Sequence, residues 1–316
     1  MKTLPLLILS GSVCVVICLC GPGLSSCTKT TTIHDTTTVN HTDTLTVRDT
    51  TVINDTVVVN DTVLNRITNG LIAYYNFNGG NLNDSSGHSN NIIFNNATPT
   101  VDRFGNANNA YLFNGNGSYM QVANSASLNP NNITMYAIIK PLGFYQGTCH
   151  GNRIINKGIP DDVSGFYTMT FEPSFNGTGG VCASIIDSTK EIFGGGFGDN
   201  IPQGAAAGAP GISMADSVYV EKYQWYTLVY TYDGTTAKFY VNGALASSVP
   251  NPGPVTFTPN SADVYIGKTA STTYPYYFNG VIDEIRIYNR ALTAQEVGYL
   301  GFSRTKYIKT PEKVIY

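Results

Sequence analysis

Short segments rich in Val, Ile and Tyr, bounded by Gly, Asn or Pro, recur from residue 70 almost to the end of this chain. Such residues favour strands, and turn residues at short intervals are typical of an antiparallel β sandwich. The clearest signal lies at 225–245, where Asp233-Gly234 and Asn242-Gly243 suit tight hairpin turns and predict a three-stranded meander. Residues 293–296 read as a capping box and predict one short helix. The predicted strands are 71–77, 91–94, 110–113, 118–122, 133–140, 153–157, 166–171, 181–186, 225–232, 237–241, 263–266 and 281–288.

The N-terminus has the layout of a secretory signal. Lys2 precedes an apolar stretch at 4–20, and a Gly-Pro-Gly break and small residues follow before Cys27. Residues 24–27 resemble the lipobox of bacterial lipoproteins, which implies acylation of Cys27 and cleavage in front of it. The alternative is a retained transmembrane anchor, because the uncharged span between Lys2 and Lys29 is long enough to cross a bilayer.

Both interpretations place the rest of the chain outside the cytoplasm and tethered to a membrane. Thr28 follows Cys27 in place of the Asp associated with inner-membrane retention. We therefore expect an outer-membrane lipoprotein at the surface of a Gram-negative bacterium. The expected parts are a signal peptide at 1–26, a stalk at 27–69, a globular domain at 70–302 and a tail at 303–316.

The charge and cysteine content narrow the function further. Charged residues make up only 12% of the chain and the net charge is −3, which gives no electrostatic case for binding nucleic acid. After removal of the signal, and with Cys27 carrying lipid, Cys149 and Cys182 remain. In an oxidising compartment they suggest one disulfide, and two separate buried thiols are the alternative.

The stalk consists of short repeats that contain an Asp-Thr pair. Thr and Val favour extended backbone, and the repeats are too few and too imperfect for a β-helix. We expect an extended spacer, with possible strand pairing between neighbouring molecules. Each pair also matches a sequon of general O-glycosylation in some Gram-negative bacteria, whereas plain Thr-rich low complexity is the alternative. The acceptors would be Thr36, Thr44, Thr50, Thr56 and Thr62.

Two halves of the globular region resemble a laminin-G-like domain. The opening half is 70–77, 83–87, 102–106, 110–115 and 118–119, and the closing half is 225–234, 239–243 and 278–292. The resemblance spans residues 70–300 in unbroken order. It implies a concanavalin A-like jelly roll of two antiparallel sheets with loops over one rim. Residues 194–214 are rich in Gly, Ala and Pro, depart from the pattern, and are expected to form a long loop.

Catalytic motifs are not evident in the sequence. Glycosidases with this jelly roll carry two carboxylates on one face of a strand, whereas Asp283 and Glu284 are neighbours and would point to opposite faces. Glu172, Glu191 and Glu221 stand alone in the sequence. The histidines show no metalloenzyme spacing, and no Gly-x-Ser-x-Gly elbow is present. We expect a protein that is not an enzyme.

The resemblance also implies a structural calcium site between an early loop and the last strand. Calcium prefers carboxylate, amide and carbonyl oxygens. The candidate ligands are Asn78, Asn83, Asp84 and Asp283. The alternative is that Asp84 forms a turn and that Asp283 pairs with Arg286 or caps a turn.

Aromatic residues in loops are the candidates for ligand binding, because flat rings stack on sugar faces and nearby polar groups bind hydroxyls. Trp225, the single tryptophan, matches a core position of the family and is expected to pack inside. The predicted binding residues are Tyr145, His150, Asn152, Tyr274, Tyr276 and Tyr277. We expect a surface recognition module for a glycan or an extracellular protein. The alternatives are a self-assembling structural protein and a divergent glycosidase.

Overall fold

The computed structural model describes residues 67–147, 151–158, 165–173, 191–199, 213–250 and 257–301, and the backbone of 15–19 and 28–32. The chain divides into two compact units, residues 1–56 and 57–316. In the first, β1 (Val15–Leu19) pairs antiparallel with β2 (Thr28–Thr32). No helix in the described parts is long and apolar enough to span a bilayer. Several predicted sites lie outside the described residues: Cys27, Cys149, His150, Cys182 and the acceptors Thr36, Thr44, Thr50, Thr56 and Thr62.

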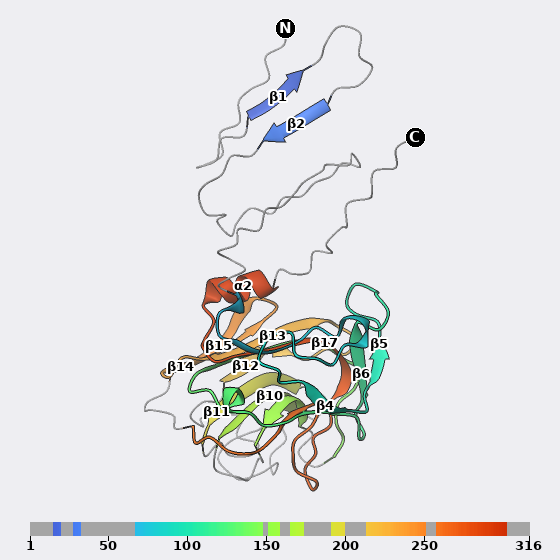
Figure 1. Cartoon of the computed structure of the whole chain (residues 1–316), viewed down its shortest axis with the longest axis vertical. Coiled ribbons are helices and arrows are strands. Elements are labelled where there is room, and N and C mark those ends of the chain that lie inside the picture. The colour runs from blue at the N-terminus through green and yellow to red at the C-terminus, as the bar shows by residue number, and fades with distance from the viewer. Residues whose placement is uncertain are drawn as a thin grey trace. The chain divides into compact units, whose positions relative to one another are not determined.

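The second unit is a sandwich of two antiparallel sheets (Figure 1). Within the described residues, seven strands form the first sheet, in the order β12 (Ser213–Tyr219), β11 (Glu191–Gly198), β10 (Phe166–Pro173), β9 (Asn152–Lys157), β16 (Val264–Ile266), β7 (Met120–Val122) and β4 (Ile92–Asn95). In the same ranges, the second sheet has the order β15 (Ala244–Pro250), β14 (Thr236–Val241), β13 (Tyr226–Tyr232), β8 (Ile133–Pro141), β17 (Asn279–Tyr288), β6 (Ala110–Asn114) and β5 (Thr98–Thr100), and β3 (Leu71–Tyr75) also pairs with β17. The helical elements are η1 (Asn78–Gly80), η2 (Ala126–Leu128) and α2 (Ala294–Gly301).

The core lies between the two sheets and is built by alternating side chains. In β7, Met120 and Val122 are buried in the core, whereas Gln121 between them is partly exposed. Phe278 lies at the aromatic centre, with its ring centroid 5.9 Å from the rings of both Phe113 and Phe171. The predicted β sandwich is confirmed, and so is the β13–β14–β15 meander.

A second apolar cluster covers the outer face of the eight-stranded sheet, where α2 packs on it. Tyr136 and Tyr288 of the sheet contact Val297 and Leu300 of the helix in this cluster. The predicted capping box holds the start of α2: the Glu296 amide donates to the Thr293 hydroxyl (3.2 Å), and the Thr293 amide donates to the Glu296 carboxylate (2.8 Å).

Trp225 also belongs to this outer cluster and is only partly buried. Its predicted place in the core is wrong for a simple geometric reason. Tyr226 next to it points into the sandwich, so Trp225 points the other way. The Lys140 ammonium lies 5.0 Å from the Trp225 ring centroid.

The Gly-rich stretch predicted as a loop is in part a strand. β11 includes Gly194, Gly195 and Gly196 and pairs with β10 along its whole length. A Cβ at Gly195 would lie 2.6 Å from the Tyr230 ring of the opposite sheet. Glycine is therefore needed here for close packing of the two sheets rather than for a turn.

Candidate functional site

The loop between β16 and β17 carries three of the predicted tyrosines and is fastened by its own hydrogen bonds. Thr269 donates from its amide to the Pro275 carbonyl (2.8 Å) and from its hydroxyl to the Tyr274 carbonyl (2.7 Å). Tyr276 has a φ of +48°, a left-handed conformation that side chains other than glycine seldom adopt. The amide of Arg153 on β9 donates to the Tyr276 carbonyl (3.0 Å), which anchors the loop to the sheet.

Four of the predicted binding residues meet at this loop. We call Tyr145, Tyr274, Tyr276 and Tyr277 the tyrosine cluster. Ring centroids lie 6.2 Å apart for both Tyr274–Tyr276 and Tyr145–Tyr276, and 6.3 Å apart for Tyr145–Tyr277. Tyr276 is buried, and the Arg153 guanidinium lies 5.0 Å from its ring. The other three rings are partly exposed, so Tyr276 supports a surface that they present.

Asn152 is fully buried and positions the cluster rather than lining its surface. Its side-chain oxygen accepts a hydrogen bond from the Tyr145 amide (2.8 Å). Its side-chain nitrogen donates to the Glu191 carboxyl (2.8 Å). The predicted role of Asn152 as a direct ligand contact is therefore replaced by an indirect one, in which it links Tyr145 to Glu191.

Glu191 is a buried acid for which the sequence indicated no partner. Burial, and then the negative charge of Glu172, raise the pKa of Glu191 to about 9, and Lys222 opposes the shift. The carboxyl group is therefore protonated at neutral pH. Within the described structure, its second oxygen, Oε1, has no hydrogen-bond partner. Sequence alone could not link Glu172 to Glu191, because only the register of β10 against β11 brings them together.

The two glutamates do not form the convergent pair that glycoside hydrolysis requires. Glu191 lies opposite Pro173, and Glu172 lies opposite Ile192, so their side chains project to opposite faces of the sheet. Glu172 is instead 3.5 Å from the Arg153 guanidinium. A retaining glycosidase needs both carboxyl groups on one side of the sugar.

The predicted calcium ligands have other partners in this structure. Asp84 accepts four hydrogen bonds, from the amides of Tyr74 (2.9 Å), Ser86 (2.8 Å) and Asn90 (3.0 Å) and from the Ser86 hydroxyl (2.8 Å). Asn78 and Asn83 lie in turns, where their amides donate to the side chains of Asn76 and Asn81. In the described parts of the chain, no three His, Cys, Asp or Glu side chains gather as a metal would require. The calcium site stays a prediction.

Asp283 pairs with Arg103, not with Arg286 as the alternative prediction had it. The Arg103 guanidinium lies 2.9 Å from the Asp283 carboxylate, and the Arg103 amide also donates to it (3.0 Å). Burial raises the pKa of Asp283 to about 6 although Arg103 opposes the shift. Arg286 pairs with Glu284 (2.6 Å), and the Arg103 guanidinium lies 3.7 Å from the same carboxylate. The prediction that Asp283 and Glu284 point to opposite faces is therefore wrong, because the register of β17 against β8 shifts between Ile282 and Glu284 and both carboxylates reach Arg103.

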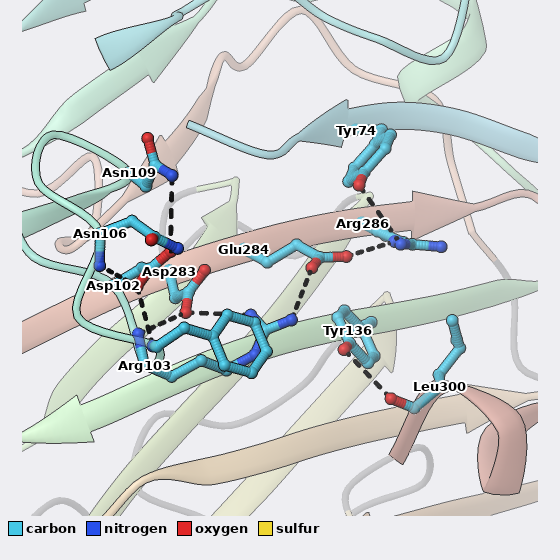
Figure 2. A network of polar contacts seen from close by, with 11 residues as sticks. Tyr74, Asp102, Arg103, Asn106, Asn109, Tyr136, Asp283, Glu284, Arg286 and Leu300 are labelled. Atoms are coloured by element: carbon cyan, nitrogen blue, oxygen red, sulfur yellow. Dashed lines mark hydrogen bonds and ion pairs between the residues drawn. The ribbon is translucent and has the colours of Figure 1, made fainter. Parts of the chain in front are cut away.

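Figure 2 shows these charges in one network. The Arg286 guanidinium lies 4.3 Å from the Tyr74 ring and 5.6 Å from the Tyr136 ring. Asp102 closes its own loop by accepting hydrogen bonds from the amides of Phe104 and Asn106, both at 2.8 Å. Burial raises the pKa of Asp102, but these and other hydrogen bonds outweigh it and leave the pKa below its usual value. The network fastens the loop at 101–109 to β17 and is structural.

Comparison with known proteins places this architecture. Residues 114–298 match the family model of the concanavalin A-like lectin/glucanases superfamily. The chain belongs to this superfamily. The laminin-G-like resemblance in the sequence is thereby confirmed, and no curated protein sequence matches the chain significantly.

Among solved structures, this superfamily member is similar to several bacterial domains. Domain 4 of AbnA, an extracellular GH43 arabinanase from Geobacillus stearothermophilus solved with arabinotriose, is 21% identical, with 73% of this chain and 98% of that chain covered and a TM-score of 0.49. The binding domain of Paraclostridial Mosquitocidal Protein 1 is 14% identical, with 75% and 53% covered and a TM-score of 0.53. The binding domain of botulinum neurotoxin serotype C1 is 13% identical, with 76% and 53% covered and a TM-score of 0.50. The match spans about half of each toxin binding domain, and these likenesses concern the fold.

Proposed function

We propose that this protein is a non-catalytic carbohydrate-binding module carried by a surface lipoprotein. The observation that supports it best is the tyrosine cluster. Tyr145, Tyr274 and Tyr277 present partly exposed rings from two loops, and buried residues hold them in place. Sugar rings stack their C–H faces on such aromatic surfaces, and phenol hydroxyls donate and accept hydrogen bonds.

The supporting shell fits a preformed binding site. Tyr276 keeps a strained backbone, Asn152 fixes the Tyr145 amide, and Arg153 lies against the Tyr276 ring. Backbone strain held by surrounding contacts is common at ligand sites. Rings that are fixed before binding lose little conformational entropy when a sugar arrives, which favours affinity.

The absence of catalysis is part of the proposal. Among the described residues near the tyrosine cluster, Glu191 is buried, and Glu172 is paired with Arg153 on the face of the sheet opposite to Glu191. Neither faces a sugar stacked on the tyrosines together with a second carboxylate. The superfamily contains both lectins and glucanases, so membership alone does not decide between binding and hydrolysis. The projection of Glu172 and Glu191 to opposite faces of the sheet favours a lectin.

The remaining features describe how the module is displayed. In the proposal, Cys27 carries the lipid, the Asp-Thr repeats form the spacer, and Cys149 and Cys182 form a disulfide. Intact-mass measurement of the membrane-extracted protein tests both the lipid on Cys27 and the disulfide. A chain that keeps residues 1–26, or lacks lipid on Cys27, contradicts the anchor. Two thiols that alkylate without prior reduction contradict the disulfide.

Glycan binding is tested with the full mature chain on a panel of neutral oligosaccharides that includes arabinotriose. We expect Tyr274→Ala and Tyr277→Ala each to weaken binding about tenfold, since each removes a stacking ring. Tyr223→Ala is the matched control, because Tyr223 is 69% exposed and outside the cluster. If no glycan binds, and the chain instead forms concentration-dependent oligomers, the self-assembling structural role replaces this proposal.

A further inference from the structure

A second group of aromatic side chains lies on the face of the seven-stranded sheet that points away from the core. Tyr265 stands between Val264 and Ile266, both of which are core residues, so it points outward. It lies opposite Gln121 of β7, and Phe94 of β4 lies opposite Gln121 in turn. Strand register therefore lines up Tyr265, Gln121 and Phe94 across three strands on this face.

The rings form one continuous surface together with Tyr119, just before β7. Phe94 and Tyr119 stack with centroids 4.7 Å apart and planes 26° apart, and Tyr119 lies 6.1 Å from Tyr265. Phe94 is 41% exposed, and the two tyrosines are half-buried. Asn96 fixes Tyr119 from both sides, since its side-chain oxygen accepts from the Tyr119 amide (2.7 Å) and its amide donates to the Tyr119 carbonyl (3.3 Å).

One cation lies over these rings. The Lys268 ammonium is 4.2 Å from the Tyr119 centroid and 5.1 Å from the Tyr265 centroid. Among the described residues, none accepts a hydrogen bond from this ammonium or forms an ion pair with it. The nearby Asp263 is engaged elsewhere, because it accepts from the Gln121 side chain (2.5 Å) and the Asn124 amide (2.8 Å).

The surroundings of Lys268 differ from those of Lys157, a buried lysine on β9. Lys157 donates to the Asn124 side chain (2.8 Å) and to the Ala262 carbonyl, so its charge is satisfied within the fold. Burial lowers the pKa of Lys268, and no acid in the described part of the chain restores it. A half-buried charge without an acidic partner is unfavourable for folding, and such charges are concentrated at functional sites.

We propose that Phe94, Tyr119, Tyr265 and Lys268, which we call the Lys268 patch, bind an acidic sugar of the uronate type. The sugar ring would stack on Phe94, the most exposed of the three rings, and its carboxylate would pair with the Lys268 ammonium, which lies over Tyr119. An ammonium group beside aromatic rings complements a uronate, because the rings can contact the C–H face of the sugar and the ammonium can pair with its carboxylate. This inference rests on the proposed carbohydrate binding. It adds a second contact area that prefers an acidic sugar over a neutral one. Thr269, the residue after Lys268, begins the loop of the tyrosine cluster.

Isothermal titration of the full mature chain with tri-galacturonate tests this. Its fully methyl-esterified form is the neutral ligand control. We expect the acidic trimer to bind at least about tenfold more tightly than the ester, because the ester cannot form the charge-assisted contact. Lys268→Gln should remove that preference, and added salt should weaken binding of the acid but not of the ester.

Lys140→Gln is the matched protein control, since Lys140 also lies over an aromatic ring, Trp225, but on the other sheet. It should leave binding of the acidic trimer unchanged. Phe94→Ala should weaken both trimers, because it removes stacking and not charge. Equal binding of acid and ester by the wild type, or a Lys140→Gln effect equal to that of Lys268→Gln, overturns the proposal. Binding of oligoglutamate with the same dependence on Lys268 also overturns it, since an acidic peptide would then be the partner.

The two sites can fail independently. Tyr277→Ala should weaken binding of a neutral glycan about tenfold and leave the charge preference of the Lys268 patch intact. If no neutral glycan binds the wild type, but tri-galacturonate does so through Lys268, the tyrosine cluster is not a binding site and the Lys268 patch is. If only the neutral glycan binds, the reverse holds.

Discussion

Replacing Glu191 by glutamine should stabilise this protein at neutral pH. The substitution keeps the size and shape of the side chain and keeps an acceptor for the Asn152 amide, which donates to Glu191 at 2.8 Å. What it removes is the need to protonate a buried acid. Glu191 is fully buried, and its pKa is raised from 4.5 to about 9 by burial and by Glu172.

The size of the effect follows from proton linkage. The folded state binds this proton more tightly than the unfolded chain does, so the wild type is most stable below pH 4.5 and loses stability as the pH rises toward 9. Each pH unit in that window costs about 1.4 kcal/mol. At pH 7, which is 2.5 pH units above 4.5, the penalty is about 3 kcal/mol. The glutamine side chain of the variant does not titrate, so the variant avoids this penalty.

Urea unfolding of wild type and variant at pH 5, 7 and 8.5 measures the difference. We expect nearly equal stability at pH 5 and an advantage for Glu191→Gln that grows with pH. Glu221→Gln is the control, because the Glu221 side chain is exposed and its substitution should give no pH-dependent gain. A Glu191→Gln variant that is no more stable than the wild type at pH 7 refutes the reasoning. It would mean that Glu191 is ionised in the fold and balanced by a cation such as Lys222.

Three further predictions concern other parts of the fold. The pKa of Asp283 is raised from 3.8 to about 6, so this carboxyl group contributes stability that is present below pH 3.8 and lost as the pH rises through 6. Asp283→Asn should flatten this pH dependence in thermal melts between pH 4 and 7. An unchanged dependence of the melting temperature on pH contradicts the burial of the charge. Gly195→Ala should lower the free energy of unfolding by about 1–3 kcal/mol, because the new Cβ meets the Tyr230 ring at 2.6 Å, and an unchanged free energy in urea unfolding would show that the sheets can separate locally. If calcium bridges Asp84 and Asp283, adding it to an EDTA-treated sample should raise the melting temperature, whereas an unchanged melt leaves both carboxylates with the structural roles seen here.

The fold was predictable because its signals are local. Two-residue turns such as Asn242-Gly243, and the alternation of buried and partly exposed residues in a strand such as β7, can be read from adjacent positions. The left-handed φ values of Asn242 (53°) and Gly243 (82°) are those a tight hairpin turn needs. The strand β11 escaped prediction because its glycines carry the usual signature of a loop. The approach of Tyr230 from the other sheet explains Gly195.

The candidate site was predictable to the extent that its residues are neighbours in the chain. Tyr274, Tyr276 and Tyr277 share one loop, and their concentration there was visible. The pairing of Arg103 with Asp283 joins positions 180 residues apart and depends on how β17 enters the sheet. The same limit hid Glu191 beneath Tyr145. Residue types can be proposed as ligands from sequence, but their division into exposed and supporting residues depends on tertiary packing.

Three unfavourable features of this fold involve one loop, at 268–277, or the residues that support it. Tyr276 within it is strained, Lys268 at its start lacks an acidic partner among the described residues, and Glu191 reaches it through Asn152 and Tyr145. The charged network of Arg103 and Asp283, by contrast, is paired throughout and fastens a loop elsewhere. Selection for stability alone would remove a buried acid that glutamine could replace. The proposed binding surface accounts for its presence near the strained Tyr276. Glu191→Gln should therefore separate folding stability from glycan affinity. Stability should rise, whereas affinity should change only if the position of Tyr145 depends on the carboxyl group of Glu191.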